Sequence, residues 1–72
     1  METEMIRKMA AETLGLDPGN IHDKTDLVTD LGANAMDLLA VAVKMEETFS
    51  VSIDREKLLK ARTVSDFSEL LD

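Results

Sequence analysis

The feature that most constrains the fold is the recurrence of apolar residues at helical spacing in four stretches of the chain, with no convincing strand. The stretches run from about Thr3 to Leu14, from Asn34 to Phe49, from Asp54 to Lys60 and from Thr63 to Leu71. Seventy-two residues leave room for one domain and not for two. The pattern therefore predicts a single all-α domain over residues 1–72, a small bundle of three main helices and one short helix.

The ends of these stretches carry residues that are typical of helix caps. Gly15 suits a left-handed C-terminal cap of the first helix. Asn34 is a favourable N-cap, and Asp37 three positions later completes the spacing of a capping box. Thr63 and Asp66 repeat that spacing before the fourth stretch, so the sequence marks the starts of two helices clearly.

A long connection over residues 15–33 separates the first two predicted helices. The run Asp17-Pro18-Gly19-Asn20 predicts a turn, because proline presets one turn dihedral and glycine or asparagine tolerates the other. A connection of this length in a small domain must be tied down or be functional. We expect apolar side chains to hold it against the core, namely Ile21, Leu27, Val28 and Leu31.

Charge and composition exclude several classes of function. The net charge is −7, and only two aromatic residues are present, so we expect no nucleic-acid partner. No apolar run is long enough to span a bilayer, and the acidic start, Met1-Glu2-Thr3-Glu4, lacks the basic region of a signal peptide. There is no cysteine, no nucleophile–base pattern and no metal-ligand spacing. We therefore expect a cytoplasmic monomer that is not an enzyme and holds no metal.

The run from Asp26 to Leu39 (DLVTDLGANAMDLL) resembles the prosthetic-group segment of acyl carrier proteins. The resemblance covers essentially the whole chain, because other pieces follow in the order and spacing of that family. They are Leu14-Gly15-Leu16, Met45-Glu46-Glu47-Thr48-Phe49, Val51-Ser52-Ile53-Asp54 and Thr63-Val64-Ser65-Asp66-Phe67. The resemblance implies the fold of that family, which agrees with the predicted bundle.

The resemblance also implies a function. In the family a phosphopantetheinyl transferase moves 4′-phosphopantetheine from coenzyme A to a serine, and the arm holds acyl groups as thioesters for enzymes of fatty-acid, polyketide or related lipid synthesis. The place of that serine here is Ala35, flanked by Asn34, Met36 and Asp37. A helix start suits a phosphodiester, since its backbone N–H groups are unpaired. Ala35 has no oxygen and cannot accept the arm.

Two explanations of Ala35 stay open. The first is an engineered Ser→Ala change in a working carrier, which needs one substitution if Asn-Ser-Met is an acceptable form of the motif. The second is natural loss of the site, favoured if the parental motif was Asp-Ser-Leu. We interpret the chain first as a carrier that lacks only its attachment hydroxyl, because the capping and core signals around position 35 are intact. The alternative is a non-carrying module that regulates or scaffolds an enzyme by docking alone.

The family's partner enzymes dock basic patches on acidic and apolar residues of the second helix and its neighbours. The resemblance places that surface at Asp30, Met36, Asp37, Val43, Glu46, Glu47 and Glu56. Lys44 and Arg55 add positive charge to a region that is usually acidic in the family, which weakens long-range attraction to a basic partner. We therefore expect a dedicated synthase or ligase as the partner.

Family members can also shelter an acyl chain between helices. The residues that would line such a pocket here are Leu39, Ala42, Met45, Ile53, Leu58, Leu59, Ala61 and Phe67. In the short third helix we expect both Leu58 and Leu59 to face inwards. All of these side chains can equally serve as plain hydrophobic core.

Overall fold

The computed structural model describes residues 2–71 and consists of helices and their connections. Its elements are α1 (Glu2–Leu14), the 3-10 helix η1 (Pro18–Asn20), α2 (Ala35–Phe49), α3 (Arg55–Leu58) and α4 (Val64–Glu69). Within that range no residue lies in a strand, so the prediction of an all-α fold is confirmed.

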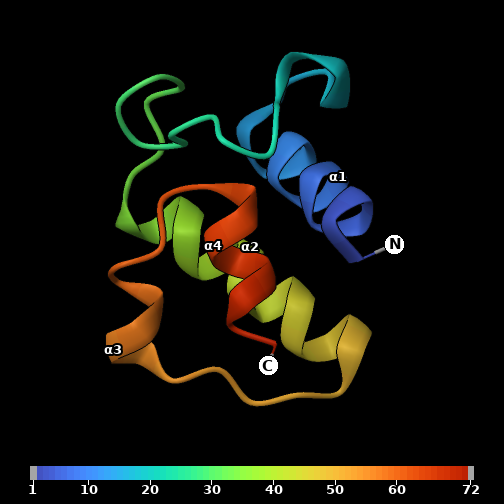
Figure 1. The fold of residues 1–72 in the computed structure, drawn as a ribbon, viewed down its shortest axis with the longest axis vertical. Helices are drawn as coiled ribbons and strands as arrows, with labels where there is room; N and C mark the ends of the chain where they lie inside the picture. Colours follow the sequence, from blue (N-terminus) through green and yellow to red (C-terminus); the bar gives the residue numbers. More distant parts are fainter. Residues whose placement is uncertain (1, 72) are drawn as a thin grey trace.

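Helix α1 packs against both of the other long helices, and α3 lies to one side. α1 contacts both α2 and α4, whereas α3 packs on α2. Figure 1 shows α3 at the edge of the molecule, on a strap of chain that leads from the end of α2 to the start of α4. The connection from α1 to α2 lies at the top of this view, and the chain from α2 to α3 lies at the bottom. This arrangement matches the predicted three main helices and one short helix.

The core lies where α1, α2 and α4 meet. Phe67 of α4 is its largest fully buried side chain, at 0% exposure. The tethers predicted in the long connection are confirmed, because Ile21 and Leu27 are buried and Val28 and Leu31 are partly buried against the core. The other buried residues are Ile6, Met9, Ala10, Ala11, Ala33, Leu38, Val41, Ala42, Met45, Ile53, Leu58, Ala61 and Val64.

The end of α1 is stabilised as its sequence indicates. Gly15 adopts a φ of 71°, the left-handed region that glycine enters without a steric cost. The N–H of Leu16 donates to the carbonyl of Ala11 at 2.9 Å, and the N–H of Gly15 donates to Glu12 at 3.4 Å. These two bonds form a Schellman motif and turn the chain sharply into the long connection.

Helices α3 and α4 are shorter than the sequence predicted. After Leu58, the N–H groups of Lys60 and Ala61 reach back three residues, to Lys57 and Leu58, instead of four. Leu70 and Leu71 do the same at the end of α4. This tighter pattern is common in a last helical turn, and it ends both α-helices two residues before the predicted ends, Lys60 and Leu71.

The prediction that Leu59 faces inwards is wrong. Leu58 is 3% exposed and belongs to the core, but Leu59 is 70% exposed. Consecutive residues of a helix point about 100° apart, and α3 has only one turn. A single turn that buries Leu58 therefore directs Leu59 outwards.

None of the helices within residues 2–71 is both long and apolar enough to cross a membrane.

Candidate functional site

Position 35 is the first residue of α2 and is exposed to solvent. Asn34 precedes it as the N-cap, with extended backbone angles. The Asn34 side-chain oxygen accepts the N–H of Asp37 at 2.9 Å, and the Asp37 carboxylate accepts the N–H of Asn34 at 3.0 Å. The predicted capping box is therefore confirmed, and it holds the backbone at position 35 in one geometry.

The capping box leaves two backbone donors of the first turn without an intrahelical acceptor. The first bond of the helix runs from the N–H of Leu38 to the carbonyl of Asn34, at 3.1 Å. The N–H of Asp37 is occupied by the cap, so those of Ala35 and Met36 remain. Unpaired N–H groups and the helix dipole favour negative charge at this point. The surroundings suit a phosphate, but the Ala35 methyl offers no atom for its attachment.

We expect Asn34→Ala to destabilise the protein by about 1 kcal/mol, because the N–H of Asp37 loses its acceptor. Urea unfolding followed by circular dichroism measures the change. Asn20→Ala is the matched control, since Asn20 is exposed at the end of η1, and its side chain is not part of a helix cap. The control should change the free energy of unfolding by less than about 0.5 kcal/mol. An equal loss in both variants would contradict the role of the cap.

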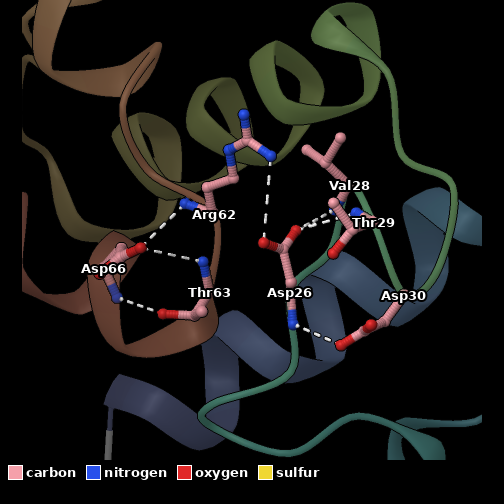
Figure 2. Close-up of polar contacts among 7 residues, drawn as sticks. All are labelled: Asp26, Val28, Thr29, Asp30, Arg62, Thr63 and Asp66. Carbon is pink, nitrogen blue, oxygen red and sulfur yellow. Dashed lines mark hydrogen bonds and ion pairs between the residues drawn. The ribbon is translucent and has the colours of Figure 1, made fainter.

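The segment that leads to position 35 is held by the Asp26 carboxylate. One oxygen accepts the N–H groups of Val28 and Thr29, each at 2.9 Å, and the other lies 3.9 Å from the Arg62 guanidinium (Figure 2). The Asp26 N–H donates in turn to the Asp30 carboxylate at 3.1 Å. This set of contacts closes the turn over residues 26–30, four residues before the N-cap of α2.

The same turn is joined to the chain between α3 and α4. The N–H of Leu27 donates to the carbonyl of Arg62 at 2.7 Å. Arg62 and Thr63 donate their own N–H groups to the Asp66 carboxylate, at 2.9 and 3.2 Å (Figure 2). Thr63 and Asp66 form the second predicted capping box. Position 35 is thus positioned from two sides, by its own cap and by a loop fastened to α4.

The pKa of the Asp26 carboxyl is lowered from its ordinary value of 3.8. The largest cause is the hydrogen bond from the N–H of Thr29, and the N–H of Val28 and the charge of Arg62 act in the same direction. Each of these contacts favours the charged form. The carboxylate therefore stabilises the fold at pH values above 3.8, and this contribution is lost as the pH falls through the lowered pKa.

We accordingly expect Asp26→Asn to destabilise the protein at neutral pH, and we expect the difference from the parent to shrink in acid. Urea unfolding at neutral and at acid pH measures both differences. Glu12→Gln, at an exposed position of α1, is the control and should follow the parent at every pH. An Asp26→Asn deficit that is as large in acid as at neutral pH would show that the charge is not the cause.

The residues expected to bind partners differ in how available they are. Asp30, Met36, Val43, Glu47 and Glu56 are exposed, and the Met36 side chain is 72% exposed. Glu47 lies at a groove of about 570 Å³ between α1 and α2, whose lining also contains Lys8 and Lys44. Its negative charge therefore has positive neighbours.

Two of the expected docking acids have structural hydrogen bonds. Asp37 belongs to the capping box, as described above. Glu46 accepts the N–H of Ile53 at 2.9 Å and lies 3.9 Å from Arg55, and its side chain is only 23% exposed. Glu46 thus fastens the chain after α2 back onto the helix. Sequence spacing did not indicate this role, because the bond joins residues seven positions apart across a turn.

A pocket of about 210 Å³ opens beside position 35, between α2 and α3. Its lining is apolar except for Arg55, and it includes three of the eight residues predicted to line an acyl pocket: Leu39, Leu58 and Leu59. The remaining lining residues are Ala35, Met36 and Leu38. Sequence reasoning assigned no pocket role to Leu38 or Arg55, because only the packing of α3 on α2 brings them together.

The other five predicted lining residues are packed in the core and do not line this pocket. They are Ala42, Met45, Ile53, Ala61 and Phe67. Leu58 belongs to both sets, since it is buried in the core and also lines the pocket. The pocket is therefore a surface hollow whose floor is part of the core.

Comparisons with known proteins agree with this geometry. Residues 4–71 match the family described as "Phosphopantetheine attachment site". The chain is similar to the acyl carrier protein of Zymomonas mobilis, with 32% identity over 96% of this chain and 88% of that protein. It is also similar to the acyl carrier protein of Bdellovibrio bacteriovorus, with 31% identity over 93% and 86% of the two chains.

A solved structure extends the similarity to three dimensions. It is that of a Mycobacterium tuberculosis protein described as an acyl carrier protein. The two structures superpose with a TM-score of 0.88 and share 25% sequence identity. The match covers 99% of this chain and 95% of the other.

Proposed function

Because the chain belongs to the acyl carrier protein family, we propose that it is an acyl carrier whose attachment position, Ala35, lacks the hydroxyl needed for the prosthetic group. Proteins of this family bear phosphopantetheine and are carriers, not catalysts, so the chain is not an enzyme. Carriers work with acyl-processing enzymes. In this proposal a serine at position 35 would hold acyl groups as thioesters on the arm, for enzymes of fatty-acid, polyketide or related lipid synthesis.

The observation that carries the proposal is the state of the helix start around Ala35. Asn34 and Asp37 form a complete capping box, and the amides of Ala35 and Met36 have no intrahelical acceptor. Position 35 is itself exposed, so a transferase can approach it. A capped, exposed helix start with two available amides is the setting that a phosphodiester at position 35 requires.

The experiment that tests the proposal restores a hydroxyl with Ala35→Ser and incubates the protein with coenzyme A and a promiscuous phosphopantetheinyl transferase. Intact-protein mass spectrometry then reports whether the arm is attached. A folded serine variant that gains no arm would remove the carrier function. A non-carrying module, the second function that the sequence left open, has no support beyond Ala35 itself.

The exposed acids and apolar residues of α2 and its neighbours support docking by partner enzymes with basic patches. The surface we assign to this role comprises Asp30, Met36, Val43, Glu47 and Glu56. Charged residues at the rim of an interface mainly accelerate association, and Met36 supplies an apolar contact next to position 35. Asp37 and Glu46 contribute negative charge to the same helix while they serve their structural bonds.

We assign the pocket beside position 35 to the first carbons of an acyl chain. Leu39, Leu58 and Leu59 supply apolar walls at the mouth. A longer chain would have to part the core, where Met45 and the small side chains of Ala42 and Ala61 are the easiest to displace. We therefore assign the mouth to short acyl groups and the core residues to an expanded state of the pocket.

A further inference from the structure

One segment of this acidic protein has the opposite charge. Residues 55–62, which we call the basic segment, have a net charge of +3, from four basic residues and one acid. The rest of the chain has a net charge of −10, from four basic and fourteen acidic residues. The basic segment comprises α3 and the chain that follows it, at the edge of the molecule (Figure 1). Positive charge is thus concentrated in one stretch of the sequence, the basic segment.

The positive side chains of the basic segment are available at the surface. Arg55, Lys57, Lys60 and Arg62 are all exposed. The two arginines have only distant partners, Glu46 and Asp26, each at 3.9 Å. Among residues 2–71, neither lysine lies within 4.0 Å of a carboxylate. Exposed ion pairs of this length contribute little to stability, so these charges are not required by the fold.

The basic segment also contains an exposed apolar residue and borders a hollow. Leu59 is 70% exposed between Lys57 and Lys60. The two lysines line a hollow of about 310 Å³ between α3 and α4, whose opposite wall carries Asp66 and Glu69. The Asp66 carboxylate already accepts two backbone N–H groups. A carboxylate that enters from solvent is thus attracted to the α3 wall of the hollow.

The basic segment adjoins the surface through which position 35 is reached. Arg55 and Leu59 line the same pocket as Ala35 and Met36. An enzyme that covers this pocket while it acts at position 35 places one edge against α3. An acidic edge would be attracted there, and a basic edge would be repelled.

We propose that the enzyme which docks on α2 presents a discrete acidic patch, with an apolar side chain against Leu59, to the basic segment. This inference rests on the proposed carrier function and specifies its partner. A bilayer or a nucleic acid would present negative charge to the whole molecule, and the −10 of the remaining residues would oppose it. A protein surface with adjacent basic and acidic patches is complementary to the acidic residues of α2 and to the basic segment.

Nuclear magnetic resonance titration of the 15N-labelled protein, as it stands with Ala35, tests the proposal. The probe is a short synthetic peptide of glutamates around one leucine. We expect saturable shifts that are confined to the amides of residues 55–62 and their neighbours in the pocket. In Lys57→Glu/Lys60→Glu, binding should be about tenfold weaker, because two attractive charges become repulsive.

The matched control is Lys8→Glu/Lys24→Glu, which reverses two exposed lysines outside the basic segment and changes the net charge by the same amount. Its affinity for the peptide should stay close to that of the parent. Equal weakening in both variants, no saturable shifts in the parent, or binding to phosphatidylglycerol vesicles in place of the peptide would overturn the proposal. The titration needs no arm, so its failure is distinct from a failure of Ala35→Ser to be loaded.

Discussion

Ala35→Ser is expected to convert a chain that accepts no phosphopantetheine into one that is loaded to completion by a promiscuous transferase. The variant adds one oxygen at an exposed position, so the free energy of unfolding should change by less than about 0.5 kcal/mol. The phosphodiester formed on that oxygen would lie at the first turn of α2, next to the amides of Ala35 and Met36. Those donors favour the product, because they meet its negative charge.

The measurement is the intact mass of the protein before and after incubation with coenzyme A and the transferase. The unchanged chain is the first control and should keep its mass, since its nearest hydroxyl upstream is Thr29, in the fastened loop. A mass gain by the unchanged chain would locate the arm elsewhere and contradict the assignment of position 35. Ala35→Ser combined with Asn34→Ala is the second control, and it should load more slowly because the helix start is less ordered.

Phe67→Ala is expected to have the largest effect on stability, a loss of about 3–5 kcal/mol. Phe67 is fully buried and is the largest side chain in the core. A 72-residue domain has a total stability of roughly 4–11 kcal/mol, at about 0.05–0.15 kcal/mol per residue. The variant should therefore lose a large fraction of the total stability. Urea unfolding followed by circular dichroism measures the loss. The dependence of the free energy of unfolding on urea concentration is taken from the parent protein.

Leu59→Ala is the matched control for Phe67→Ala and also tests the corrected position of Leu59. Both substitutions remove a large apolar side chain, but Leu59 is 70% exposed. We expect a change of less than about 0.5 kcal/mol for Leu59→Ala. A loss comparable with that of Phe67→Ala would mean that Leu59 is buried in solution, as the sequence pattern alone predicted.

The local signals in the sequence were reliable where one turn of chain contains all the interacting groups. The capping box of Asn34 and Asp37 joins residues three apart, and the Schellman motif at Gly15 lies within six residues. Such contacts depend on short spacings that can be read directly, and all of them formed as predicted. The position of Ala35 at a capped helix start was predictable for the same reason.

The signals were weaker where a residue's role depends on a distant segment. Leu58 and Leu59 are adjacent and equally apolar, and only the packing of α3 on α2 decides which is buried. Glu46 reads as an ordinary surface acid until the chain after α2 turns back to donate the Ile53 N–H to it. Arg55 lines the pocket beside Ala35 although twenty positions separate them in the sequence.

The sequence by itself determined the helical fold, the starts of α2 and α4, the family and the missing oxygen at position 35, because these follow from periodicity, capping pairs and residue identity. The tertiary structure alone decided which apolar residues remain exposed, that the Arg62 carbonyl holds the loop before α2, and that a basic segment borders the pocket at position 35. These features depend on how short elements pack across long separations. That packing depends on the contacts among all buried side chains together. A local sequence pattern does not contain this information.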